Sequence, residues 1–93
     1  MRTIKRGSQF KRDMKREQHS LRQRKMIDEF LEVISLLAQD IPLHARYLDH
    51  ALIGEWKDHR DCHIRPDLVL IYRKPDDATL QLVRLGSHAQ LGL

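Results

Sequence analysis

The 93-residue chain has little of several residue types, and each shortage narrows what it can be. With a single cysteine, Cys62, it can form no internal disulfide, and a zinc cluster built on several cysteines is disfavoured. No apolar run approaches the roughly 20 residues that span a bilayer, and residues 1–6 lack the apolar stretch of a secretory signal. We therefore expect a cytoplasmic protein that has no contact with membranes.

Aromatic residues are also scarce, at 5% of the chain, although apolar residues make up 41%. A chain of this length buries one modest core, and so few rings leave that core thin. We therefore expect residues 1–93 to form one small domain of two packed layers.

Charge is distributed unevenly along the chain. Residues 1–25 hold ten Lys and Arg against two acidic residues, which is +8, and residues 26–93 hold seven against eleven, which is −4. A basic lobe of this kind suits the phosphates of a nucleic acid, because binding them releases condensed counterions. Lys and Arg residues also occur on helix faces that are only exposed to solvent. Nucleic-acid binding and simple solvation therefore both stay open.

The first half of the chain has helical periodicity. After a possible short strand at Thr3–Lys5, Ser8 is placed to cap a first helix. From Leu21 onward apolar residues recur at spacings of three and four, which predicts a longer amphipathic helix. This second helix should end near Asp40, because Pro42 cannot extend it.

The second half has the pattern of short strands. We predict an irregular connection at residues 41–53 and strands at residues 55–57, 60–64, 68–73 and 79–85. Helices first and a meander of strands afterwards predict an α+β fold. In this fold two N-terminal helices pack on one face of a four-stranded, mainly antiparallel sheet.

Three ionisable side chains are expected to converge at one end of that sheet. Alternation along residues 60–64 puts Cys62 and Ile64 on the helix side, and Asp61 and His63 on the open side. Asp67 precedes the next strand and His88 follows the last one, so both should lie near the end of the sheet where His63 is found. His50, on a preceding loop, could also reach this end.

Such a cluster suits acid–base chemistry, because histidine both accepts and donates protons near neutral pH. Metal-free cleavage of RNA needs a base for the 2′-hydroxyl, an acid for the leaving 5′-oxygen, and cations for the phosphate. The candidate RNA-binding cations are Lys57, Arg60, Arg65 and Arg84. Adjacent strand residues such as Cys62 and His63 do not readily share one metal ion, so we expect no metal and no cofactor. For any single histidine, simple solvation remains the alternative.

Five short segments resemble the signature of the YafQ branch of the RelE superfamily of bacterial toxins. They are Asp49–Leu52, Gly54–Lys57, Arg60–Asp67, Leu70–Tyr72 and Leu85–His88. The resemblance implies the toxin of a type II toxin–antitoxin pair, a ribosome-dependent endoribonuclease (mRNA interferase) that cuts mRNA in the ribosomal A site and inhibits translation. It also implies a RelE-like microbial RNase fold.

Carried over position by position, the resemblance implies catalytic roles for His50, His63, Asp67 and His88. The implied partners are the ribosome, mRNA and a cognate DinJ-like ribbon-helix-helix antitoxin. Operator DNA would be reached only through the complex with that antitoxin.

The chain departs from the family pattern at three positions. Arg65 stands where glutamate is common, Leu68 where tryptophan is frequent, and Gly92 where an aromatic residue is usual. The last two changes remove rings that can stack on a base, at about 1–3 kcal/mol each. We therefore expect cleavage that is weaker or differently aimed.

Two other functions fit the same residues. One is a non-catalytic module that binds RNA or the ribosome. The other is a protein that mainly joins its antitoxin at an operator and tunes repression.

Overall fold

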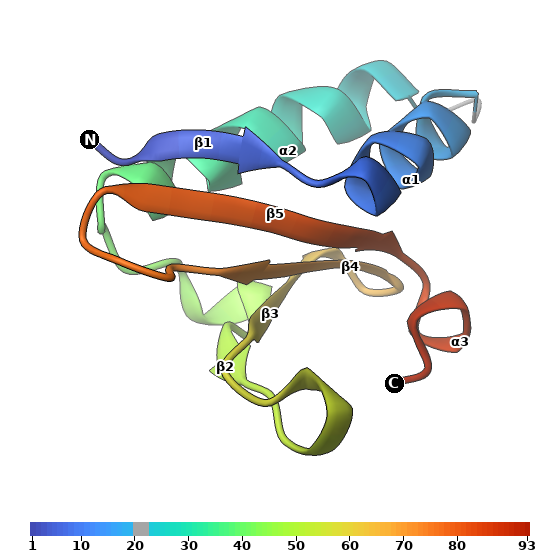
Figure 1. Ribbon diagram of the computed structural model, residues 1–93. Coiled ribbons are helices and arrows are strands. Elements are labelled where there is room, and N and C mark those ends of the chain that lie inside the picture. The colour runs from blue at the N-terminus through green and yellow to red at the C-terminus, as the bar shows by residue number, and fades with distance from the viewer. Residues whose placement is uncertain (20–22) are drawn as a thin grey trace.

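The structure, a computed structural model, describes residues 1–19 and 23–93, which form a five-stranded sheet with two helices on one face (Figure 1). The strands are β1 (Thr3–Arg6), β2 (His50–Ala51), β3 (Arg60–Arg65), β4 (Leu68–Arg73) and β5 (Thr79–Gly86). The helices are α1 (Ser8–Gln18), α2 (Gln23–Ala38) and α3 (His88–Leu91), with 3-10 turns η1 (Ala45–Tyr47) and η2 (Gly54–Trp56). The α+β prediction is confirmed.

The predicted number of strands is wrong, because the sheet has five strands in the order β1-β5-β4-β3-β2. β1 is a full member of it and runs parallel to β5, while the other neighbours are antiparallel. His50–Ala51, expected in an irregular connection, pairs with β3 as an edge strand. The strand expected at residues 55–57 is instead the turn η2, since Gly54 has a φ of 68° and bends the chain away from the sheet.

Both predicted helices are present, and α1 begins close to its predicted position. Gly7 rather than Ser8 is the N-cap of α1, and it offers no side-chain hydrogen bond. The expected start of the second helix at Leu21 lies outside the described residues. Its end is confirmed, because α2 stops at Ala38 and Asp40 adopts a left-handed backbone with a φ of 58°.

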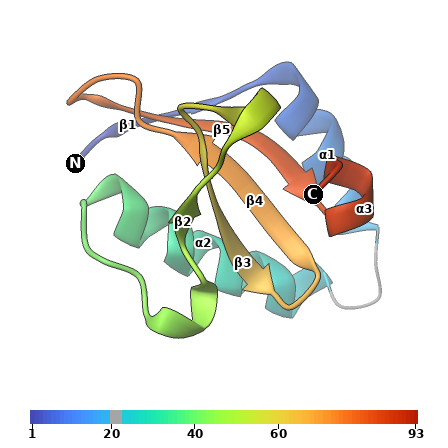
Figure 2. The same ribbon diagram turned by 90° about the horizontal axis from the view of Figure 1, so that it is seen from below.

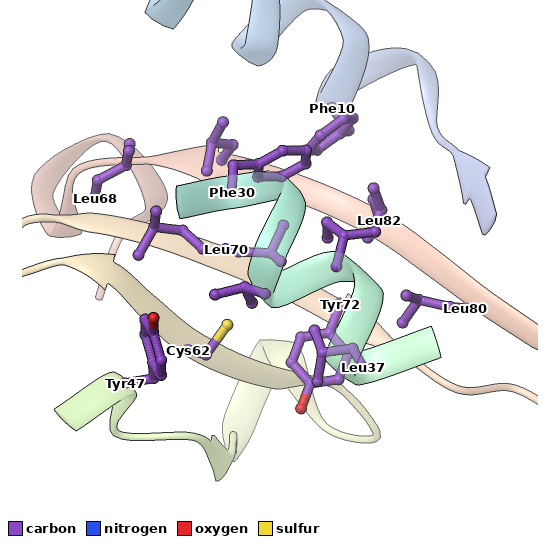
Figure 3. Packing of buried hydrophobic residues seen from close by; sticks show 14 of the residues in the cluster. Phe10, Phe30, Leu37, Tyr47, Cys62, Leu68, Leu70, Tyr72, Leu80 and Leu82 are labelled. Carbon is purple, nitrogen blue, oxygen red and sulfur yellow. The ribbon is translucent and has the colours of Figure 1, made fainter. Parts of the chain in front are cut away.

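The main core fills the space between the helices and the sheet (Figure 3). The Phe10 ring of α1 stacks on the Phe30 ring of α2, with centroids 5.8 Å apart. Cys62 and Ile64 of β3 point into this core, as the alternation predicts. Asp61 and His63 therefore lie on the opposite face of β3.

We expected this opposite face of the sheet to be open, but it carries a small second core. Val69, Ile71 and Leu91 are buried there, with Leu52 and Trp56 packed against them. Figure 2 shows the segment from β2 to η2 crossing this face, while α2 lies behind the strands. Charged residues on this face are therefore partly covered by chain from elsewhere in the sequence. No helix within the described ranges is long and apolar enough to cross a membrane.

Candidate active site

His63, Asp67 and His88 meet at one end of the sheet, as their spacing predicts. The Nδ1 atom of His88 lies 2.6 Å from Oδ1 of Asp67, and the backbone N–H of His88 donates to the same oxygen at 3.0 Å. The rings of His63 and His88 have centroids 5.0 Å apart and are inclined at 70°. Two imidazoles and one carboxylate thus form a contiguous group.

The short helix α3 holds His88 in this place. Its N-cap residue Ser87 accepts a hydrogen bond from the backbone N–H of Gln90, whose side chain accepts one in return from the backbone N–H of Ser87. Leu91 anchors the other side of α3 in the second core. His88 is therefore fixed by both ends of the helix that carries it.

His50 lies on β2 directly opposite Asp61 of β3. Its Nδ1 atom is 2.7 Å from the carbonyl oxygen of Leu48 and 3.0 Å from Oδ1 of Asp61. A carbonyl oxygen only accepts, so the proton of a neutral His50 sits on Nδ1 and its Nε2 lone pair is free. His50 is half-exposed, which leaves Nε2 accessible to a substrate.

Asp61 is the site residue that sequence reasoning missed. It is 2% exposed, and burial raises the pKa of its carboxyl, while the charges of His50, His63 and His88 oppose that rise. All three histidines therefore lie close enough to Asp61 to act on it electrostatically. Alternation did place Asp61 on the face of His63, but the segment that buries it could not be anticipated.

Asp67 has the opposite environment. Its side chain is exposed, and the backbone N–H of His88, then the His88 side chain, lower the pKa of its carboxyl. Asp67 is therefore held as a carboxylate against His88.

Three of the four candidate RNA-binding cations are already paired with acidic side chains. Lys57 is exposed on a turn. The arginines are engaged with acidic partners: Arg60 with Asp49 at 3.3 Å, Arg65 with Glu29 at 3.1 Å and Arg84 with Asp13 at 2.7 Å. Arg84 thus fastens β5 to α1, an arrangement that sequence spacing does not reveal.

A groove of about 700 Å³ extends from His63 along β3 toward α2. Its charged lining residues are Lys25, Glu29, Arg46 and Arg65, and its apolar lining includes Leu48, Ile64 and Pro66. The guanidinium of Arg46 lies 4.8 Å above the Tyr47 ring and donates to its hydroxyl. The groove therefore joins a positively charged wall to the histidine cluster.

Cys62 is buried in the main core, and burial strongly raises the pKa of its thiol. Within residues 1–19 and 23–93, no group of three or more His, Cys, Asp or Glu side chains could hold a metal ion. The chemistry that the arrangement supports is proton transfer between imidazoles and carboxylates.

Fold and site together define a small α+β protein with a cluster of histidine and aspartate side chains at one end of its sheet. A family model described as "Bacterial toxin of type II toxin-antitoxin system, YafQ" matches residues 2–92. The chain therefore belongs to the YafQ family of type II toxins.

Individual relatives agree with this assignment. The mRNA interferase toxin YafQ of Escherichia coli strain K12 is 38% identical over 91 residues, which cover 97% of this chain and 95% of that protein. The crystal structure of the E. coli DinJ–YafQ complex matches with a TM-score of 0.80 at 35% identity, covering 98% of each chain. A metal-bound toxin from Helicobacter pylori matches with a TM-score of 0.82 at 39% identity, covering 98% of this chain and 99% of that one.

Proposed function

We propose that this chain is an mRNA interferase, an endoribonuclease that cleaves mRNA in the ribosomal A site and so inhibits translation. The observation that carries the proposal is the cluster of His50, His63 and His88 with Asp61 and Asp67. The name of the E. coli relative, an mRNA interferase toxin, supports it. Ribosome-bound mRNA as the substrate also places the activity in the cytoplasm.

The proposed reaction assigns a role to each histidine. The free Nε2 of His50 takes the proton of the 2′-hydroxyl, and the 2′-oxygen attacks the adjacent phosphorus. The bond from phosphorus to the 5′-oxygen breaks, and His88 in its imidazolium form gives that oxygen a proton. Asp67 favours this charged form of His88 from 2.6 Å. The products are a 2′,3′-cyclic phosphate and a 5′-hydroxyl.

His63 lies beside His88, with ring centroids 5.0 Å apart, and lines the groove. We assign it to the scissile phosphate, which it reaches from β3. Lys25 and Arg46 then bind the neighbouring phosphates of the RNA strand. Arg65 and Arg84 are less suited to this role, because Glu29 pairs with Arg65 and Asp13 with Arg84. Charge complementarity thus favours RNA along the groove.

The basic lobe and the partner follow from the same proposal. Residues 1–25, at +8, suit the phosphates of ribosomal RNA. By analogy with the E. coli complex, a DinJ-like antitoxin binds the chain, and operator DNA is contacted through that complex.

Mapping of mRNA 5′ ends in a purified translation mixture tests the proposal. We expect the wild-type protein to create new 5′ ends within ribosome-bound codons, and His63→Ala to create about 10²-fold fewer, because removing one preorganised group that stabilises charge in the transition state costs on this scale. Translation arrest by the wild type without new 5′ ends would instead support a non-catalytic ribosome binder. Cleavage of free mRNA as fast as of ribosome-bound mRNA would overturn ribosome dependence.

A further inference from the structure

Asp61 is a buried carboxylate that the proposed reaction leaves unused. It is 2% exposed, and no hydrogen bond from the described residues reaches its Oδ1 atom. Burying a charge without full hydrogen bonding is expensive, so a position of this kind needs a functional reason more often than a structural one. Its cross-strand neighbours are His50 on β2 and Ile71 on β4, so one flank is a catalytic candidate and the other is apolar.

Asp61 and the Leu48 carbonyl compete for one proton. Both face Nδ1 of His50, at 3.0 Å and 2.7 Å respectively. The shorter contact aligns the N–H with Leu48, which is why Oδ1 of Asp61 is at ion-pair distance yet accepts no hydrogen bond. A small rotation of the imidazole would bring the N–H onto the carboxylate.

We propose that Asp61 is a positioning residue that acts through His50 by balancing the positive charge that His50 acquires as a base. The inference rests on the proposed function and adds a residue to its mechanism. When His50 has taken the 2′-hydroxyl proton, it carries a positive charge 3.0 Å from a carboxylate. A carbonyl dipole such as that of Leu48 is weaker compensation than a full negative charge at low dielectric.

The other charged groups around Asp61 fit this role. His50 faces it from β2, His63 from its own strand and His88 from α3, and all three favour the carboxylate form. Asp49, before β2, acts in the opposite direction. Burial raises the pKa of Asp61 more than any other cause, so the carboxylate depends on the imidazoles as much as they depend on it.

Asp61→Asn tests the inference in the ribosome-dependent cleavage assay, because the amide nearly preserves shape and removes the charge. We expect kcat to fall about 10²-fold with KM unchanged, because the positive charge that His50 acquires in the reaction loses its neighbouring anion. The matched control, Asp77→Asn on the exposed β4–β5 turn, should behave as the wild type.

A double-mutant cycle separates positioning from general damage to the site. In a His50→Ala background, Asp61→Asn should change cleavage by less than about twofold, because a residue acting through His50 has nothing left to act on. Full additivity of the two substitutions would overturn the inference, as would wild-type kcat in Asp61→Asn.

Ring ¹⁵N shifts of His50 provide a readout that does not depend on cleavage. We expect the Nδ1–H form in the wild type, and in Asp61→Asn different ring ¹⁵N shifts of His50, because the negative charge 3.0 Å from Nδ1 is gone. If the wild type cleaves no mRNA but this change occurs, the positioning stands and the proposed function fails. If the wild type cleaves and the His50 signals are the same in both proteins, the positioning fails and the function stands.

Discussion

The molecule contains two histidine–aspartate pairs that are alike in composition and opposite in environment. In the His88–Asp67 pair the carboxylate side chain is 69% exposed and sits 2.6 Å from Nδ1 of its imidazole. In the His50–Asp61 pair the carboxylate side chain is 4% exposed and sits 3.0 Å from Nδ1. The pKa of Asp67 is lowered and that of Asp61 is raised. The proposed acid, His88, and the proposed base, His50, therefore differ in the burial of their carboxylate partners and not in residue type.

The difference has a simple physical origin. Asp67 sits on an exposed turn, where the backbone N–H of His88 stabilises its charge. Asp61 is the second residue of β3 and is buried, so water solvates its charge poorly. Burial of the carboxylate therefore costs stability in the His50–Asp61 pair, and the exposed carboxylate of the His88–Asp67 pair carries no such cost.

Among these predictions, removal of His88, the imidazole of the exposed pair, should lower the cleavage activity most. We expect His88→Ala to lower kcat for mRNA cleavage about 10³-fold, because the 5′-oxygen loses its proton donor. Steady-state cleavage of ribosome-bound mRNA measures this. His19→Ala, which removes an exposed imidazole at the end of α1, is the control and should keep full activity. Equal activity of the two variants would remove His88 from the mechanism.

Asp13 sharpens the comparison, because it is buried like Asp61 but fully partnered. It accepts hydrogen bonds from Arg84 at 2.7 Å, Arg16 at 3.1 Å and the backbone N–H of Leu85 at 3.0 Å. Burial raises its pKa, but these bonds and charges outweigh that effect and lower it.

Asp13→Ala should therefore lower the free energy of unfolding by about 3 kcal/mol, since it leaves Arg84 facing an empty site. Urea denaturation measures the loss. Asp28→Ala on the exposed face of α2 is the control and should change stability by less than about 0.5 kcal/mol. A loss no larger than that of the control would show that this buried network does not hold α1 on β5.

The two carboxylates of the site should also respond to pH in opposite directions. The folded pKa of Asp67 is lowered, so its stabilisation is present above 3.8 and is lost as the pH falls through the folded value. The folded pKa of Asp61 is raised, so its contribution is present below 3.8 and is lost as the pH rises through the folded value.

At neutral pH we therefore expect Asp67→Asn to be less stable than the wild type, and Asp61→Asn to be at least as stable. Urea midpoints measured from pH 7 downward check both expectations. Both differences in stability from the wild type should disappear at acid pH, where the two carboxyl groups are protonated. An Asp61→Asn protein that is clearly less stable at pH 7 would show that the ionised carboxylate stabilises the fold.

The smallest expected effect concerns the groove. Lys25→Ala should raise KM for ribosome-bound mRNA about threefold and leave kcat unchanged, because one exposed phosphate contact contributes little and is screened by salt. Lys74→Ala, whose ion pair with Asp40 lies away from the groove, is the control. A fall in kcat with constant KM would move Lys25 from binding to catalysis.

Much of the framework follows from local patterns. Period-two alternation identified which face of β3 carries His63, and two antiparallel neighbours joined at residues 75–78 bring Asp67 and His88 to one end. Apolar residues at spacings of three and four predicted the helix α2. His50 was only a possibility from spacing, and the family resemblance was needed to include it in the site.

Long-range contacts decided what the patterns could not. β1 joins the sheet by pairing with β5, more than 70 residues away in sequence. Arg84, expected near the phosphate, is bound to Asp13. Asp61 is buried on the face of the sheet that the segment from β2 to η2 crosses, and no property of β3 itself encodes that crossing (Figure 2).

By itself, then, the sequence determined the α+β class, the faces of its strands and the convergence of His63, Asp67 and His88. Each of these depends on neighbours within a few residues or on adjacent strands joined by a short turn. Only the tertiary structure decided which carboxylate is buried and which arginines are already paired. Burial and ion pairing depend on segments distant in the chain, and they set the charge state on which the proposed chemistry relies.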